Sequence, residues 1–171
     1  MDNQTLQIQL TALRTGDPAA LEAIYEGMKT PLYTVILRIT RREALAEEVL
    51  QELFLKLYRS PPGETVRNPR AYLFQMARNL AIDCLKAQRP EDTPEAEPPG
   101  RDWGDLDVRL DLEAALGALE PVDSQIITLH INGALPFRQV AQVLSMPLGT
   151  VLWRYQRALN RLRVMLSGGA R

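Results

Sequence analysis

A short acidic, proline-rich stretch near the middle of this chain limits what the chain can fold into. Residues 89–104, RPEDTPEAEPPGRDWG, contain four prolines and five acidic residues but almost no apolar side chains. Such a segment buries too little surface to offset the entropy lost when its backbone is ordered, so it is predicted to be a flexible linker. We therefore expect two small domains, at residues 1–89 and 105–171, joined by a linker at 90–104.

The segments on both sides of this linker carry helix signals and almost no strand signals. There is no sustained period-two alternation and no Asn-Gly hairpin turn. Asp17-Pro18 and Asn68-Pro69 each combine an N-cap residue with Pro at the first helical position, and Ser60-Pro61-Pro62-Gly63 is a turn cluster. The predicted fold class is all-α. Helices are expected near residues 17–28, 31–41, 43–58, 68–88, 105–118, 122–131, 136–144 and 149–166.

The net charge of −1 hides a strong segregation of charge along the chain. Residues 1–90 carry 12 basic and 10 acidic side chains, residues 91–120 carry 2 and 10, and residues 121–171 carry 6 and 1. The three balances are +2, −8 and +5. A basic C-terminal part beside an acidic middle is typical of a chain of which only part meets nucleic-acid phosphates.

Composition also excludes several kinds of site. Cys84 is the single cysteine and His130 the single histidine, so neither an internal disulfide nor a Cys/His zinc site is expected. The start of the sequence has no secretory signal pattern, and no stretch approaches roughly 18 uninterrupted apolar residues. We therefore predict a cytoplasmic protein without membrane insertion, metal or cofactor.

The C-terminal segment predicts two helices joined by a short turn. Ser145-Met146-Pro147 interrupts an apolar helical pattern, and Gly149-Thr150 begins the next helix. One side of that second helix is apolar, whereas Arg154, Arg157 and Arg161 form a stripe on another side. Such a helix can enter a DNA major groove, and the simpler alternative is a solvated arginine face. The preceding helix, the turn and the local charge of +5 favour DNA binding.

These residues resemble the fourth domain of sigma factors, the subunits that bring bacterial RNA polymerase to promoters. The matches to the family pattern are Leu119-Glu120-Pro121, Val140-Ala141, Leu144, Pro147, Gly149-Thr150-Val151, Arg154, Arg157-Ala158 and Leu162. The resemblance implies a helix-turn-helix whose second helix reads the promoter's minus-thirty-five element. The residues that it places on DNA are Thr150, Trp153, Arg154, Arg157 and Arg161.

The reading helix departs from the family at two positions. Leu152 and Trp153 stand where the family usually has Lys and Ser, at the base-facing start of the helix. Losing a cation there weakens contact with phosphates. Trp153 points outward together with Gln156 and Asn160. An outward Trp is compatible with contact to thymine methyl groups, packing on a neighbouring domain, or binding of a protein partner.

The helix expected at 43–58 has an apolar side and a polar face that contains one leucine. The residues alone leave open whether Glu48, Gln51, Glu52 and Leu55 form a docking surface or a solvated face. The stretch AEEVLQELFLKLY resembles the D-x-x-Q-E-x-F signature of the second sigma domain, with Glu48 at the Asp position and Phe54 matching. The resemblance implies that this face docks on the β′ clamp helices of core RNA polymerase.

The stretch NPRAYLFQMARNLAIDCLK resembles the segment that follows in the same sigma domain, which holds the melted minus-ten strand. The matches are Arg70, Ala71, Leu73, Ala77, Arg78, Asn79 and Asp83, with Tyr72 standing for Trp. The predicted core stripe of this helix is Leu73, Ala77, Leu80 and Cys84. Single-strand contacts are implied for Arg67, Asn68, Arg70, Tyr72, Gln75, Arg78, Asn79 and Lys86.

Two features of this strand-binding segment have consequences for binding. Aromatic rings stack on bases and cations follow the backbone, although packing of Tyr72 against the preceding loop is equally compatible with the sequence. Few cations follow the helix, so we expect binding to free DNA to be weak and salt-sensitive.

Both motifs occur in the family's order on one short chain, which is identified as a member of the extracytoplasmic-function (ECF) sigma factors of the sigma-70 family. The resemblance implies three partners: core RNA polymerase (its β′ clamp helices and β flap), promoter DNA and an anti-sigma factor. No enzyme is predicted, because Cys84 lies on a core stripe and His130 lacks a suggestive partner.

Two other functions are compatible with parts of the sequence. One is a sigma-like module that binds polymerase or an anti-sigma factor with weak or no DNA reading, which Leu152, Trp153 and the missing arginine run after the strand-binding helix favour. The other is a helix-turn-helix repressor, which would explain residues 121–166 only.

Overall fold

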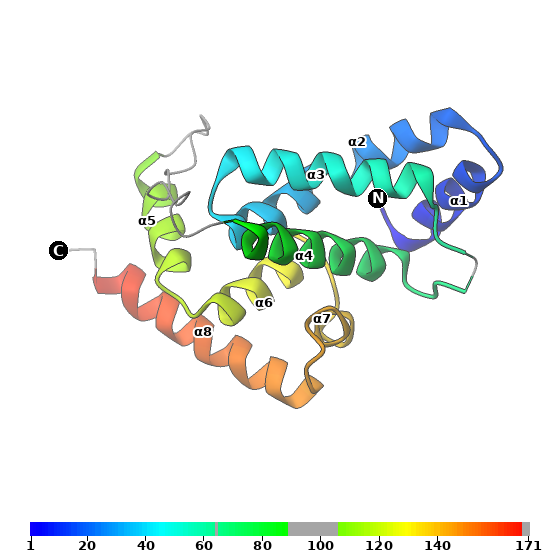
Figure 1. Ribbon diagram of the computed structural model, residues 1–171. Helices are drawn as coiled ribbons and strands as arrows, with labels where there is room; N and C mark the ends of the chain where they lie inside the picture. Colours follow the sequence, from blue (N-terminus) through cyan, green and yellow to red (C-terminus); the bar gives the residue numbers. More distant parts are fainter. Residues whose placement is uncertain (64, 89–105, 169–171) are drawn as a thin grey trace.

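The computed structural model describes residues 1–63, 65–88 and 106–168, and within these ranges the regular structure is entirely helical (Figure 1). This confirms the predicted all-α fold class. The predicted linker at 90–104 lies outside the described residues. The helices are α1 (Asn3–Arg14), α2 (Pro18–Thr40), α3 (Glu43–Arg59), α4 (Pro69–Ala87), α5 (Leu106–Gly117), α6 (Pro121–Ile131), α7 (Phe137–Leu144) and α8 (Leu148–Gly168).

Helix α1 was not predicted, although its sequence carries helix signals. Asp2 caps it, because the Asp2 side chain accepts a hydrogen bond from the Thr5 backbone N–H at 2.7 Å. Its buried residues, Leu6, Leu10 and Leu13, recur at helical spacing and pack into the N-terminal core.

Helix α2 runs without interruption through Pro31, where the sequence predicted a break between two helices. Pro inside a helix costs about 3 kcal/mol, because it removes a hydrogen bond and crowds the preceding turn. Burying one large aliphatic side chain returns about 1.5–3 kcal/mol. The fully buried side chains on both sides of Pro31 share one face at a spacing of four: Ile24, Met28, Leu32 and Ile36. Tertiary packing therefore outweighs the local cost.

Helix α4 is buried on more of its surface than the predicted stripe. Leu73 and Ala77 are fully buried, as expected, whereas Leu80 and Cys84 are only partly buried. Phe74 and Ala81 are also fully buried, outside that stripe. The reason is that α4 packs against four other helices, α1, α2, α3 and α7. The predicted stripe was therefore incomplete.

The C-terminal helices form the expected helix-turn-helix. Ser145 ends α7 in the left-handed conformation (φ 53°), and the chain turns through Met146-Pro147 into α8. Helices α5, α6 and α7 all pack on α8. A separate small core lies beside α8 and contains Ala115, Leu116, Leu119, Ile127, Ala158 and Leu162.

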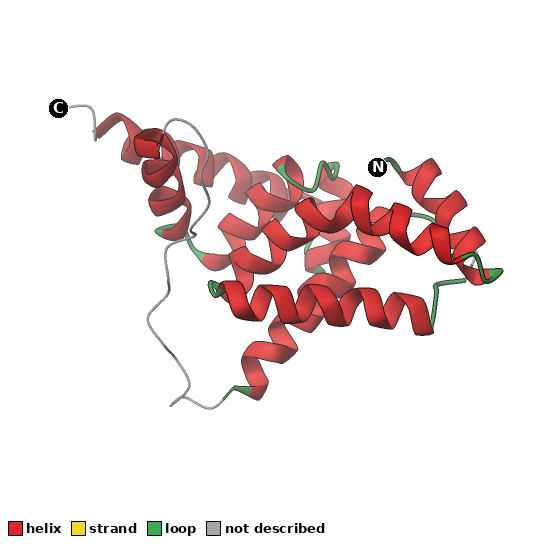
Figure 2. Cartoon of the chain, turned by 90° about the horizontal axis from the view of Figure 1, so that it is seen from above, coloured by secondary structure: helices red, strands yellow, loops and turns green. Residues whose placement is uncertain are grey.

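The two halves of the chain pack directly on each other (Figures 1 and 2). Helix α6 lies against α2, and α7 lies against α4. Apolar residues of α6 and α7, including Ile126, Leu129 and Val140, belong to the same hydrophobic cluster as α1–α4. None of the described helices combines the length and apolar character needed to cross a bilayer.

Gly133, just after α6, lies close to the backbone of its own helix and to a ring of the N-terminal half. A Cβ atom at this position would lie 2.4 Å from the Leu129 carbonyl oxygen and 3.2 Å from the Phe74 ring. Only glycine fits without a shift of the backbone at the end of α6.

Candidate functional site

The predicted docking face of α3 is exposed along its length. Glu48, Gln51 and Glu52 all face solvent, and Leu55 keeps 42% of its surface exposed. This confirms that the four residues share an outer face, because the buried residues of α3, such as Leu53 and Leu57, occupy the opposite side.

A groove of about 930 Å³ runs between this face and α2. Its lining combines aromatic rings with the polar edge of α3, and the residues involved are Leu21, Tyr25, Lys29, Thr30, Tyr33, Ala44, Glu47, Glu48, Leu50, Gln51, Phe54, Leu55 and Tyr58. The Tyr25 ring meets Phe54 edge-to-face with centroids 5.0 Å apart, and Lys29 Nζ lies 5.2 Å from the Tyr25 centroid. Tyr58 is 58% exposed. The surface is therefore rich in the side chains that anchor protein interfaces.

The predicted strand-binding residues of α4 contact the chain's own C-terminal half. Asn68 Oδ1 accepts a hydrogen bond from Gln139 Nε2 at 3.1 Å, and Arg78 Nε donates to Gln125 Oε1 at 3.1 Å. These two side chains therefore pair with the C-terminal half, because α6 and α7 lie over this part of the N-terminal half, and their contact with the minus-ten strand stays a prediction.

Arg70 contacts both halves of the chain. Its Nη2 donates to the Gly133 carbonyl at 2.5 Å, and its Nη1 donates to the Met1 carbonyl. The Arg70 backbone N–H also donates to Asn3 Oδ1 at 3.0 Å. Burial lowers the pKa of the Arg70 guanidinium from its ordinary value, while the nearby charge of Asp2 opposes that shift.

The remaining predicted strand contacts lie on the outside. Arg67, Gln75, Asn79 and Lys86 are exposed, as expected for residues that meet a ligand. Tyr72 is partly buried and packs against the hydrophobic core, a position that neither stacking on a base nor packing on the preceding loop predicted. The predicted surface is thus divided between an exposed part and a part covered by the C-terminal half.

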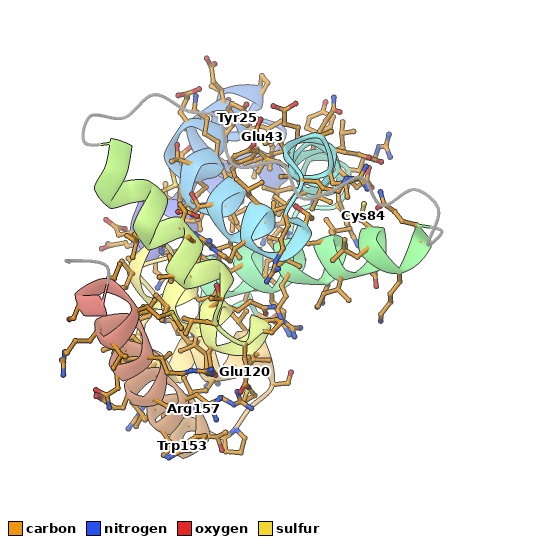
Figure 3. All side chains as sticks on the ribbon, turned by 90° about the vertical axis from the view of Figure 1, so that its left-hand side faces the viewer. Tyr25, Glu43, Cys84, Glu120, Trp153 and Arg157 are labelled. Carbon is orange, nitrogen blue, oxygen red and sulfur yellow. The ribbon has the colours of Figure 1, made fainter. Side chains whose placement is uncertain are left out.

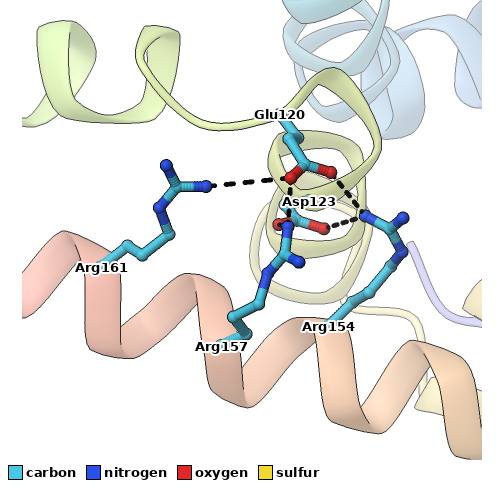
Figure 4. Close-up of polar contacts among 5 residues, drawn as sticks. All are labelled: Glu120, Asp123, Arg154, Arg157 and Arg161. Carbon is cyan, nitrogen blue, oxygen red and sulfur yellow. Dashed lines mark hydrogen bonds and ion pairs between the residues drawn. The ribbon is translucent and has the colours of Figure 1, made fainter.

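The arginine stripe of α8 is engaged in ion pairs rather than directed freely outward (Figure 4). Arg154 Nη1 donates to Asp123 Oδ1 at 2.7 Å and to Glu120 Oε2 at 3.0 Å. Arg157 Nη2 donates to Asp123 Oδ2 at 3.1 Å and also to Glu120 Oε1. Arg161 Nη1 lies 3.9 Å from Glu120 Oε1. Arg154 and Arg157 are therefore paired within the chain, Arg161 is exposed, and contact of the three arginines with DNA stays a prediction.

Local structure explains why Asp123 can be a fully buried carboxylate. It stands in the first turn of α6, after Pro121 at the helix start, where the helix dipole favours a negative charge. Its side chain is 0% exposed and meets two guanidinium groups. Hydrogen bonds from Arg154 and then Arg157 lower the pKa of Glu120, and hydrogen bonds to Asp123 and then Glu120 raise the pKa of Arg154.

Glu120 and Asp123 are functional candidates that sequence reasoning missed. An acid two positions after a helix-opening proline was visible, but nothing local connects it with arginines more than 30 residues later. The separations are 31 residues for Asp123–Arg154 and 37 for Glu120–Arg157.

The outer face of α8 is uncharged near its start. Trp153 is 58% exposed and Leu152 40% exposed, which confirms that both point outward. Gln156 and Asn160 are also exposed, whereas Thr150 is partly buried. The Arg157 guanidinium lies 5.0 Å from the Trp153 ring centroid, so the ion-paired arginine also supports the indole (Figure 3).

The other predicted features concern metal binding and the lone thiol. Within the described ranges, no three His, Cys, Asp or Glu side chains gather to hold a metal ion. Desolvation first, and the charge of Glu48 second, raise the pKa of the Cys84 thiol, while Arg42 opposes them. A raised pKa keeps the thiol protonated and unreactive at neutral pH.

Comparison with known proteins finds two family models along the chain. Residues 24–91 match Sigma-70 region 2, and residues 109–162 match Sigma-70, region 4. The ECF RNA polymerase sigma factor SigL of Mycobacterium tuberculosis is 30% identical over 169 residues, covering 92% of this chain and 95% of SigL.

Solved structures share the fold. One is CnrH in complex with the cytosolic domain of CnrY, with a TM-score of 0.73, 19% identity, and coverage of 97% of this chain and 99% of the other. Another is the sigma factor RpoE in complex with the anti-sigma factor NepR from Bartonella quintana, with a TM-score of 0.70, 20% identity, and coverage of 88% and 99%.

Proposed function

Because this chain belongs to the ECF RNA polymerase sigma factors of the sigma-70 family, we propose that it docks on core polymerase through the outer face of α3 and the groove beside α2. The observation that carries this proposal is that Glu48, Gln51 and Leu55 are exposed and line that groove, with the exposed Glu52 on the same face of α3. A leucine and exposed tyrosines ringed by polar side chains have the composition of an interface centre. The polymerase element in contact is the pair of β′ clamp helices.

The N-terminal half also binds the opened minus-ten strand along α4 and the loop before it. Arg67, Gln75, Asn79 and Lys86 are exposed and available to a strand. Asn68, Arg70 and Arg78 become available only when α6 and α7 leave α4, because each now bonds to the C-terminal half. Promoter binding therefore requires the two halves to separate.

In the C-terminal half, α8 contacts the minus-thirty-five element. The other surfaces of this half contact the β flap of polymerase. An anti-sigma factor is a further partner, supported by RpoE, which was solved with one. The site of action is the cytoplasm, where polymerase works. The domain limits at residues 89 and 105 are part of the proposal, and the separate matches at residues 24–91 and 109–162 support a division of the chain into two domains.

Run-off transcription with core polymerase on fragments of the host genome tests this function. The informative variant is Gln51→Ala/Glu52→Ala, and the matched control is Gln4→Ala/Glu22→Ala, which removes an exposed amide and an exposed acid outside the groove. We expect discrete transcripts from wild type and control but not from the α3 variant.

Binding of core polymerase, measured in parallel, separates the alternatives. If core polymerase binds the wild-type protein but no transcript is produced, a sigma-like binding module without DNA reading is the better description. If core polymerase does not bind the wild-type protein, the docking proposal itself is contradicted.

A further inference from the structure

We propose that α8 recognises A·T base pairs in the minus-thirty-five element, with Leu152 and Trp153 against thymine methyl groups and the amide of Gln156 on adenine. Asp123 and Glu120 make this possible by occupying Arg154 and Arg157, the two arginines of the stripe nearest the start of α8, which would otherwise read guanine. The inference rests on the proposed function and names the base pairs that the same helix selects.

The positive charge near the start of α8 is bound by carboxylates of the same chain. Guanine is read most often by a free guanidinium or ammonium group that donates two hydrogen bonds to its O6 and N7 atoms. Arg154 donates to both Asp123 and Glu120, and Arg157 does the same. Since two carboxylates neutralise these cations, a guanine contact would first have to break the hydrogen bonds to the buried Asp123.

The outward face of α8 beside the two paired arginines carries no charge near the start of the helix. At about 100° per residue, Trp153, Gln156 and Asn160 fall within roughly 60° of one another, opposite the buried Val151. All three are exposed, and Leu152 beside them is 40% exposed. This outward face therefore presents amides and apolar groups. Gln and Asn amides pair with the N6 and N7 atoms of adenine, and apolar groups contact the thymine methyl.

The Trp153 indole is supported on one side by an ion-paired arginine. Arg157 lies 5.0 Å from the Trp153 ring centroid and is itself bound by Asp123 at 3.1 Å. The chain Asp123–Arg157–Trp153 thus connects a buried carboxylate to the exposed ring across α6 and α8 (Figures 3 and 4). A ring supported on one side loses less conformational freedom when it meets a base.

A protein partner could also cover an exposed Trp. DNA is the occupant we favour, because two amides share the face with Trp153 and the preceding α7 and turn complete a helix-turn-helix.

The test uses holoenzyme, formed from the full chain and core polymerase, on a promoter mapped by run-off transcription. Three duplexes carry single-atom or single-group changes in the minus-thirty-five element: thymine to deoxyuridine, which removes only the methyl group; adenine to 7-deaza-adenine; and guanine to 7-deazaguanine. Protein variants are Trp153→Ser, Gln156→Ala and, as a control, Val164→Ala, which trims an exposed apolar residue near the other end of α8.

We expect deoxyuridine to weaken binding of wild type and V164A several-fold and binding of W153S distinctly less, because Leu152 is then the remaining contact with the methyl group. Holoenzyme with wild-type protein should bind the 7-deaza-adenine duplex about tenfold more weakly than the unmodified duplex, which is the usual size of the contribution of a bidentate contact to a base. Holoenzyme with Q156A should bind the two duplexes nearly equally. Sensitivity to 7-deazaguanine alone would overturn the inference, and so would a W153S protein that loses core polymerase rather than DNA. Absence of any start site would remove the proposed function, and this inference with it.

Discussion

Asp123 and Arg154 form a 2.7 Å ion pair that joins the first turn of α6 to the reading helix α8. Arg157 approaches the other oxygen of the same carboxylate at 3.1 Å. The orientation of α8 relative to α6 therefore depends on a buried charge as well as on apolar packing between the two helices.

Removing the Asp123 carboxylate should destabilise the protein strongly. Asp123→Ala leaves two guanidinium groups without their buried partner, and breaking such a pair typically costs 3–5 kcal/mol. We expect about 3 kcal/mol, at the lower end, because Arg154 and Arg157 keep some contact with water. Chemical denaturation of the two proteins measures the difference.

Ser124→Ala is a matched control for that experiment. Ser124 is the buried neighbour of Asp123, and its hydroxyl oxygen has no hydrogen-bond partner among the described residues. Its removal should therefore be nearly neutral or stabilising. A loss as large as that of D123A would mean that packing at the start of α6, rather than the ion pairs, governs stability there.

The ion pairs of Glu120 should make stability depend on pH in the acidic range. Its folded-state pKa lies below the ordinary value of 4.5, because Arg154 and Arg157 bond to the carboxylate. The contribution is therefore fully present above pH 4.5 and is lost as the pH falls through the lowered pKa. Glu120→Gln should be less stable than wild type at pH 7, and the difference should vanish in acid. Glu22→Gln, an exposed acid on α2, should show no comparable pH-dependent gap.

Holding the two halves together should block transcription reversibly. Asn68 and Gln139 hydrogen-bond across the contact between the α4 segment and α7 at 3.1 Å. Cysteines at both positions, in a Cys84→Ala background, can be joined with a short reducible cross-linker. We expect the cross-linked protein to lose run-off transcription and to regain it on reduction. Equal activity before and after reduction, with each single-cysteine protein as reference, would contradict the proposed separation.

Cys84 should react slowly with alkylating reagents at neutral pH. Desolvation and the charge of Glu48 raise its pKa above the ordinary 9.0, so little thiolate is present near pH 7. Iodoacetamide should modify the folded protein much more slowly than the denatured protein, with the folded rate rising only in strongly alkaline buffer. Cys84→Ser should transcribe like wild type. Rapid modification at pH 7 would show that the thiol is activated rather than inert.

Much of the local structure was predictable from the sequence. Proline-led starts at Pro18 and Pro69, the turn at Ser145–Pro147 and helical periodicity identified most helices and the helix-turn-helix. The exposed faces of α3 and α8 followed from the same periodicity, because the side-chain direction in a helix depends on spacing alone. The resemblance to sigma factors, carried by short motifs, agreed with the matched regions.

What only the tertiary structure decided are the relations between distant segments. The sequence identified Arg154 and Arg157 as outward cations, but both donate hydrogen bonds to the carboxylate of Asp123, some 30 residues earlier. Arg70 likewise donates a hydrogen bond to the Gly133 carbonyl in the other half of the chain. Helix periodicity and capping act within a few residues, whereas ion pairs and domain contacts depend on how whole helices pack. For that reason the sequence determined which side chains α4 and α8 present, and the packing of α6 and α7 decided which of them remain available.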